Sequence, residues 1–321
     1  MIPSEFQYFA PATVDEAVGL LQQHGDDAKL IAGGHSLLPA LKLRLSSPSV
    51  LIDVSKIGGL DTITVNGSVT IGAGATYRAI ASSDAVRGAC GVLAECVAQI
   101  GDNQVRNRGT IGGSLAHADP AADLPAVALA LGASVTAKGP GGERSIGADD
   151  MFVEMLTTAL EPNEVIIAVT FPTLGAGEGA AYEKLRQPAS RYAIVGVAAY
   201  VKLGADGNVA EARVAVTGAG LRAGLDLPWI GASLMKMAWM CRPELQVSSL
   251  SGQRVLIPSS AFSQATSMIL SPQPKHGLMA GSKQVMCSLK ALMASCTSPN
   301  ARRISSAARE RTFPALRWKR C

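Results

Sequence analysis

The 321-residue chain is poor in aromatic residues, at 4%, and in charged residues, at 17%. It has no uncharged apolar run of the roughly 18 residues that a membrane-spanning helix requires. Glu5 stands where a secretion signal would carry basic residues ahead of an apolar core. We therefore expect a cytoplasmic protein with no transmembrane segment.

The six cysteines form no CxxC pair. This pattern argues against a zinc site or an iron–sulfur cluster held by this chain alone. The sequence also shows no Ser/His/Asp or Cys/His arrangement and no cluster of metal ligands. We therefore predict no catalytic residue and no metal ligand in this chain. The cysteines are Cys90, Cys96, Cys241, Cys287, Cys296 and Cys321.

The most informative stretch, residues 106–125, reads RNRGTIGGSLAHADPAADLP. Its glycines can bring backbone N–H groups close to anionic oxygens, and the two arginines before them add positive charge. Asp123 could accept hydrogen bonds from sugar hydroxyls. The stretch predicts a phosphate-and-ribose cradle. It lacks the Lys-Ser/Thr ending of a P-loop and the GxGxxG spacing of a Rossmann turn. A plain Gly-Gly turn is the alternative.

A second glycine motif lies near the N-terminus. A short buried strand over Ala28–Ala32 leads into Gly33-Gly34-His35-Ser36, and a helix is expected over Leu37–Leu45. Ser36 is the predicted cap of that helix, whose N–H groups would face an anion. A tight strand-to-helix turn without a ligand is the alternative.

The remaining elements follow from local signals. Thr13 and Glu16 predict a capping box for a helix over Thr13–Gly25, and Asn66-Gly67 predicts a hairpin within Asp61–Ile71. Further helices are expected over Thr76–Ser83, Val86–Ile100 and Asp119–Leu131, and strands over Val50–Val54, Ala133–Lys138, Glu143–Ile146, Glu164–Phe171, Ala180–Leu185, Ala193–Leu203 and Val209–Thr217. A linker of small residues, 175–179, is the first domain boundary.

After Gly220 the composition changes. Residues 221–321 hold 14 Lys+Arg and 3 Asp+Glu, a net charge of +11, whereas residues 1–220 hold 15 and 22, a net charge of −7. All three tryptophans and seven of the ten methionines lie in 221–321. The shift indicates a frame-shifted or foreign end, or else an unusual native basic tail. This basic excess lies outside the patterned part of the chain, so it does not predict nucleic-acid binding.

Three motifs in this order resemble the FAD-binding medium subunit of the molybdenum hydroxylase family, which includes the carbon monoxide dehydrogenase flavoprotein and the xanthine dehydrogenase FAD-binding subunit. They are AGGHS at residues 32–36, TIGGS at 110–114 with DPAADLP at 119–125, and YEK at 182–184 with SRYAIV at 190–195. The resemblance covers residues 1 to about 220.

The resemblance implies an α+β, PCMH-type fold with two FAD-binding subdomains, 1–57 and 58–175, and the start of a smaller α+β domain at 176–220. That last domain would be disrupted by the atypical tail, 221–321. The resemblance also implies cofactor contacts, with Asp123 on a sugar hydroxyl and Tyr192 over the flavin ring. The implied FAD-binding residues are Lys29, Leu30, Ile31, Ala32, Gly33, Gly34, His35, Ser36, Ile100, Thr110, Ile111, Gly112, Gly113, Ser114, Asp123, Ile166, Lys184 and Tyr192.

By the same resemblance, the chain is an oxidoreductase subunit with noncovalent FAD. A large partner subunit would carry the molybdenum cofactor and a small one the 2Fe–2S clusters, in a dimer of heterotrimers. Electrons would pass from the clusters through FAD to NAD, a quinone or another acceptor. The alternatives are a flavin- or nucleotide-binding accessory module without redox partners, and an inactive fragment.

Overall fold

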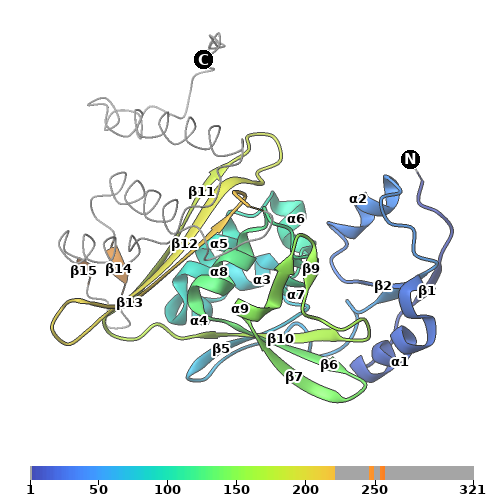
Figure 1. Cartoon of the computed structure of the whole chain (residues 1–321), viewed down its shortest axis with the longest axis horizontal. Helices are drawn as coiled ribbons and strands as arrows, with labels where there is room; N and C mark the ends of the chain where they lie inside the picture. Colours follow the sequence, from blue (N-terminus) through green and yellow to red (C-terminus); the bar gives the residue numbers. More distant parts are fainter. Residues whose placement is uncertain (1, 221–245, 249–253, 257–321) are drawn as a thin grey trace, which may run out of the picture.

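The computed structural model describes residues 2–220, 246–248 and 254–256. Three sheet-bearing parts follow one another along the chain, and a layer of helices lies between the second and third sheets (Figure 1). The N-terminal part is at one end of the molecule and the long strands of the third sheet are at the other (Figure 1). This mixed helix and sheet architecture agrees with the expected α+β class.

The N-terminal part holds a parallel sheet in the order β1-β3-β2. Its elements are β1 (Gln7–Phe9), α1 (Val14–His24), the 3-10 turn η1 (Gly25–Asp27), β2 (Ala28–Ile31), α2 (Leu37–Lys42) and β3 (Val50–Asp53). The predicted cap of α1 is confirmed, because Thr13 Oγ1 accepts from the N–H of Glu16 at 3.2 Å. Glu16 reaches back to the N–H of Ala12 at 2.7 Å, one residue before the expected partner. Ala17, Val18 and Leu21 bury the inner face of this helix.

The second part holds an antiparallel sheet in the order β4-β5-β10-β6-β7. These strands are β4 (Ile63–Val65), β5 (Ser68–Gly72), β6 (Ser134–Gly139), β7 (Gly142–Gly147) and β10 (Val165–Pro172). The predicted turn between β4 and β5 is confirmed, with Gly67 at φ +68°. Val69, Ile71 and Val169 are fully buried, so the sheet forms the floor of the main core.

Helices cover this sheet. They are α3 (Tyr77–Ser82), α4 (Asp84–Ala89), α5 (Gly91–Ala98), α6 (Asn103–Arg108), α7 (Ile111–His117), α8 (Asp123–Leu131) and α9 (Ala148–Met151), followed by the short strands β8 (Phe152–Glu154) and β9 (Thr157–Thr158). The single helix predicted over Val86–Ile100 was wrong. Cys90 has φ −152° and ψ 69°, which breaks the segment into α4 and α5.

The predicted start of α8 at Asp119-Pro120 was also wrong. The helix begins at Asp123, and Asp119 Oδ1 instead accepts from the N–H of Ala121 at 2.8 Å. That local bond turns the chain before the helix, since aspartate favours such turns as readily as helix caps. The predicted stop is confirmed, with Gly132 in the left-handed conformation at φ +62°.

The third sheet is antiparallel, in the order β11-β12-β13. Its strands are β11 (Glu178–Arg186), β12 (Ala193–Leu203) and β13 (Val209–Thr217). Helix α8 packs against β12 and β13, and all of its residues are buried. Two further strands, β14 (Gln246–Ser248) and β15 (Arg254–Leu256), pair with each other. Apart from them, the tail interpretation and its range 221–321 lie outside the described residues, and the expected domain boundaries stay predictions.

Candidate functional site

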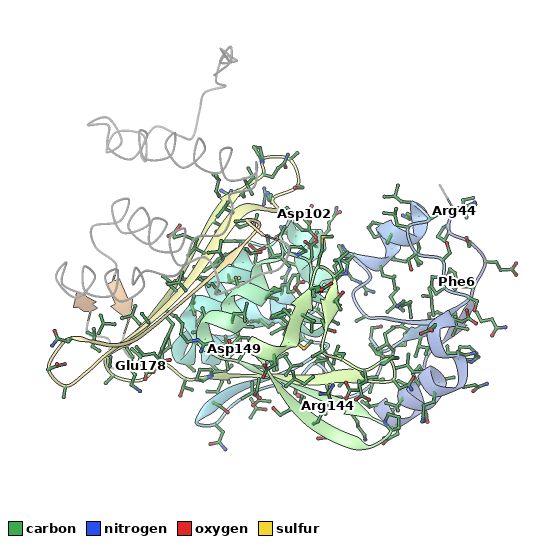
Figure 2. All side chains as sticks on the ribbon, viewed as in Figure 1. Phe6, Arg44, Asp102, Arg144, Asp149 and Glu178 are labelled. Atoms are coloured by element: carbon green, nitrogen blue, oxygen red, sulfur yellow. The ribbon has the colours of Figure 1, made fainter. Side chains whose placement is uncertain are left out.

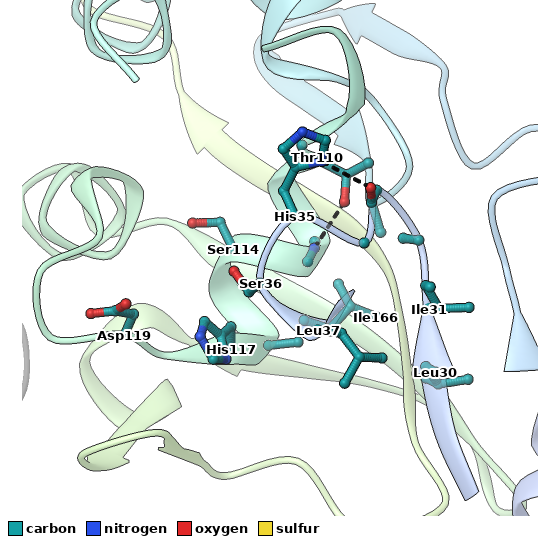
Figure 3. Close-up of a pocket in the computed structure, with 18 of the residues that line it drawn as sticks. Leu30, Ile31, His35, Ser36, Leu37, Thr110, Ser114, His117, Asp119 and Ile166 are labelled. Carbon is teal, nitrogen blue, oxygen red and sulfur yellow. Dashed lines mark hydrogen bonds between the residues drawn. The ribbon is translucent and has the colours of Figure 1, made fainter. Parts of the chain in front are cut away.

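A cavity of about 590 Å³ lies between the N-terminal part and the helical layer of the second part. Cofactor sites commonly have volumes of about 300–1,000 Å³. The lining comes from segments far apart in sequence: residues 28–37, 73–77, 100–123, 156–166 and 190–192. Figure 3 shows His35 and Ser36 facing Thr110 and Ser114 across this space. The cavity is thus large enough for a cofactor and is assembled by the tertiary fold.

The two glycine motifs meet at the wall of the cavity. A Cβ atom placed on Gly33 would lie 2.0 Å from the carbonyl oxygen of Arg108 and 3.1 Å from the Cα of Gly109. No side chain fits there, because the opposing atoms belong to the backbone. Both motifs therefore line one crevice, as the hypothesis of a shared phosphate cradle requires.

The first motif lines the cavity and contains backbone donors that are unused within the described part of the chain. Gly34 has φ +76°, which favours glycine, and the ring nitrogen Nδ1 of His35 lies 3.1 Å from the carbonyl oxygen of Gly33 (Figure 3). Within the described part of the chain, the backbone N–H groups of residues 33–36 donate to no protein acceptor. A row of free N–H groups can bind an anion such as a phosphate.

Ser36 does not cap α2, contrary to the prediction. Its backbone is helical, with φ −100° and ψ −45°, and its side chain makes no capping hydrogen bond. A capping residue normally has an extended backbone, so the conformation itself prevents the bond. Ser36 lines the cavity instead.

The second motif is helical, although the sequence suggested a loop. Gly112 and Gly113 form the first turn of α7, and Thr110 Oγ1 accepts from the N–H of Gly113 at 3.1 Å (Figure 3). The N–H of Gly112 donates to the carbonyl of Ala73 at 2.9 Å. A Cβ atom on Gly112 would lie 2.5 Å from the Cβ of Ala73. These glycines allow close packing of α7 on the chain after β5, and their N–H groups already have protein acceptors.

The two arginines before this motif, Arg106 and Arg108, were expected to add positive charge to the site, but neither side chain lines the cavity. Arg106 donates through Nη1 to the carbonyls of Ile100 at 2.9 Å and Gly101 at 3.0 Å. Arg108 is exposed and does not line the cavity with its side chain. Arg106 therefore shapes the loop at residues 100–101, which does line the cavity.

Asp123 sits at the bottom of the cavity in a buried polar cluster. Its Oδ2 lies 2.8 Å from Nζ of Lys184, and the hydroxyl of Tyr182 donates to its Oδ1. Asp123 is 5% exposed and the Lys184 side chain is 1% exposed. Burial raises the pKa of Asp123, while the Lys184 ammonium and the Tyr182 hydroxyl act in the opposite direction by favouring the carboxylate. Cys96 is buried beside this cluster, and burial raises the pKa of its thiol.

The rim of the cavity is formed by the turn between β11 and β12. Arg191 adopts a left-handed backbone with φ +58°, and its Nη1 lies 3.4 Å from the carbonyl oxygen of Gly101. Tyr192 is half-exposed and lies next to Asp119, whose position in the lining is labelled in Figure 3. Partial burial, and then the Asp119 carboxylate, raise the pKa of Tyr192 to about 12. Tyr192 thus adds an aromatic side chain to the lining of the cavity.

All but two of the predicted site residues line the cavity. The exceptions are Ile111, which is fully buried in the core, and Lys184, which reaches the site only through Asp123. The sequence analysis left out several lining residues: Tyr77, Gly101, Val105, His117, Asp119, Glu161, Ser190 and Arg191. Asp119, His117, Ser190 and Arg191 lie within or beside the quoted motifs, so a wider window around these motifs would have found them.

Among residues 2–220 and the two short described strands, no group of three or more His, Cys, Asp or Glu side chains could hold a metal ion. No helix in the same described part is long and apolar enough to cross a membrane.

Comparisons with known proteins agree with this geometry. A family model described as the FAD binding domain in molybdopterin dehydrogenase matches residues 4–174. The carbon monoxide dehydrogenase medium chain of Hydrogenophaga pseudoflava is 44% identical over 218 residues, 68% of this chain and 76% of that protein. The 6-hydroxypseudooxynicotine dehydrogenase complex subunit alpha of Paenarthrobacter nicotinovorans is 42% identical over 221 residues, 68% of this chain and 75% of that protein.

A solved structure contains a chain with a similar fold. The carbon monoxide dehydrogenase from Hydrogenophaga pseudoflava that lacks the Mo-pyranopterin moiety contains a chain with a TM-score of 0.72 and 35% sequence identity. The match covers 94% of this chain and 99% of that chain.

The fold and the cavity define a flavoprotein with a two-part FAD-binding domain. The chain belongs to the FAD-binding medium subunits of the molybdenum hydroxylase family, whose members are oxidoreductase subunits. The residues present fit the cofactor: free N–H groups at residues 33–36 suit a diphosphate, and the cavity volume suits a dinucleotide.

Proposed function

We propose that this chain holds FAD noncovalently in the cavity and passes electrons from the 2Fe–2S clusters of a small partner subunit to an acceptor such as NAD or a quinone. A large partner subunit would carry the molybdenum cofactor and oxidise the substrate, in a dimer of heterotrimers. A bound flavin would take up electrons singly from one-electron carriers such as 2Fe–2S clusters and release them in a pair to a two-electron acceptor such as NAD, so it would connect the two kinds of carrier. The cytoplasmic location expected from the sequence stays a prediction.

The observation that carries this proposal is the contact between Gly33 and the Arg108–Gly109 peptide, which joins the two motifs in one crevice. The free N–H groups of residues 33–36 would bind the diphosphate. Ile100 and Ile166 would contact the cofactor through apolar atoms, and Tyr192 would cover the flavin ring. These residues bind and orient the cofactor and exclude water.

Asp123 would accept a hydrogen bond from a sugar hydroxyl at the bottom of the cavity. A carboxylate offers about four acceptor positions, so the bonds to Tyr182 and Lys184 leave capacity for a ligand. Lys184 would act on the cofactor through Asp123. Its ammonium holds that carboxylate in the charged, accepting form.

The deciding experiment is co-expression with the products of the flanking genes, purification of the complex, and analysis of flavin, iron and molybdenum. Stoichiometric FAD together with iron and molybdenum supports the electron-transfer role. Acid precipitation that leaves all flavin in the supernatant supports noncovalent binding. FAD without iron or molybdenum would instead favour an accessory flavin-binding module, and absence of all three would favour an inactive fragment.

A further inference from the structure

The third sheet binds α8 at both ends, and the N-terminal end of this helix lines the cavity at Asp123. At the N-terminal end, Tyr182 and Lys184 of β11 bind Asp123. At the C-terminal end, Arg213 of β13 donates through Nη2 to the carbonyl of Leu129 at 2.8 Å. The same nitrogen lies 2.5 Å from Oδ1 of Asp149, which Figure 2 labels at the base of the helical layer. The family model ends at residue 174, so the residues of the third sheet that make these contacts lie outside it.

A further tether comes from the end of β13. Thr217 is fully buried, and its Oγ1 lies 2.7 Å from the carbonyl oxygens of both Pro120 and Ala122. A hydroxyl carries one hydrogen, so the two carbonyls share it. The next residue, Gly218, donates its N–H to the carbonyl of Pro120 at 2.8 Å. The last residue of β13 and the residue directly after it therefore hold the turn at residues 119–122.

Thr217 and Gly218, which we call the β13 anchor, are themselves held by the third sheet. Gly218 has φ +80°, and a Cβ atom there would lie 2.5 Å from the carbonyl oxygen of Ile194 on β12. The end of β13 is thus packed against the neighbouring strand with no room for a side chain. Because the anchor is tightly packed, it can fix the position of the turn.

The turn itself forms part of the cavity. Asp119 and Ala122 line the cavity, and Asp123 follows directly. Within the turn, the bonds from Ala121 and Ala122 to Asp119 are local, so they set its shape but not its position on the protein. Thr217 and Gly218 fix its position from the third sheet, in addition to the bonds of Tyr182 and Lys184 to Asp123 directly after the turn.

We infer that Thr217 is a positioning residue of the cofactor site, whose hydroxyl places the 119–122 turn, and with it Asp119 and Asp123, against bound FAD. The inference rests on FAD occupying the cavity. Removing the hydroxyl leaves the partly buried carbonyl of Ala122 without this donor, whereas Pro120 keeps the N–H of Gly218. An acceptor that is shielded from water and loses its donor weakens the arrangement that depends on it.

The test uses the full chain with Thr217→Val, which removes the hydroxyl, and Thr217→Ser, which keeps it. Thr170→Val is the matched control: among the described residues its hydroxyl is hydrogen-bonded to Thr70 alone, at 3.3 Å within the second sheet, and it does not line the cavity. FAD titration of each apoprotein by fluorescence gives the affinity, and visible circular dichroism of the bound flavin reports its surroundings. We expect Thr217→Val to bind FAD about tenfold more weakly with an altered dichroism spectrum, and Thr217→Ser and Thr170→Val to match the wild type.

Equal affinity and spectra for Thr217→Val and Thr170→Val would overturn the inference, as would a Thr217→Ser variant as weak as Thr217→Val. If Thr217→Val does not yield folded protein, Thr217→Ser decides, since wild-type affinity supports the role of the hydroxyl and a tenfold loss refutes it. A wild-type chain that binds no FAD would refute the proposed function itself, and the inference with it.

Discussion

Gly33→Ala adds a single methyl group at the place where the two glycine motifs touch. The new Cβ would lie 2.0 Å from the carbonyl oxygen of Arg108 and 2.7 Å from its carbonyl carbon. Ordinary contacts of a Cβ atom begin near 3.4 Å, so the two backbones must separate by more than about 1 Å. Neither side can give way by rotating a side chain, because both are main chain.

The cost follows from overpacking. Inserting a methyl group into a well-packed region costs about 1–3 kcal/mol. Here the strain acts across the crevice, so we expect it to reduce FAD affinity by about five- to 150-fold, since 1.4 kcal/mol corresponds to tenfold. The free N–H groups of residues 33–36 would move away from the second motif with the same displacement.

The matched control is Gly19→Ala. Gly19 lies inside α1 with nothing within 4 Å of an added Cβ, so alanine there should raise stability by about 0.5–1 kcal/mol. Isothermal titration of each apoprotein with FAD measures the affinity, and chemical denaturation measures the stability. Wild-type affinity in Gly33→Ala would refute the view that the contact of the two motifs forms the cofactor site.

Three further variants give separate outcomes. Gly34→Glu forces a side chain onto a residue at φ +76°, so the purified protein should lack flavin absorbance; retained absorbance contradicts this. Lys184→Met leaves Asp123 buried without its cation and should cost about 3–5 kcal/mol in urea unfolding near pH 8. This loss of stability should shrink as the pH falls, because burial raises the pKa of Asp123 in the folded state. The folded variant then binds a proton at a pH where the unfolded chain does not, and protonation removes the unpaired buried charge. Arg144 lowers the pKa of Glu164, so the stability from this pair is present above about pH 4.3 and is lost as the pH falls further. Arg144→Met should lower the stability at pH 7 and flatten that loss, and an unchanged acid profile argues against the pairing.

Helix caps, turns and helix ends could be predicted from the sequence where a single residue type determines the local backbone conformation. Thr13 caps α1, Gly67 turns β4 into β5, and Gly132 ends α8, as the sequence indicated. In each case the deciding interaction lies within a few residues along the chain. The α+β class followed from the family resemblance.

Errors arose where tertiary contacts compete with local signals. Gly112 and Gly113 suggested a flexible loop, but packing against Ala73 draws them into a helix. Asp119 carried the signals of a helix cap, yet the turn after it is held by Thr217, nearly a hundred residues later. Sequence spacing alone contains no information about such a partner.

For the site, all but two of the predicted residues line the cavity, but they are fewer than half of the residues that line it. The buried pairing of Asp123 with Tyr182 and Lys184 was not predicted, since it depends on how β11 packs beside α8.

The lining of the cavity begins with Leu21 of α1 and ends with Tyr192, directly before β12. During translation, a ribosome must deliver the chain through that tyrosine before the cavity can close. A chain cut short before Tyr192 would therefore lack part of the flavin site even if its earlier segments had folded.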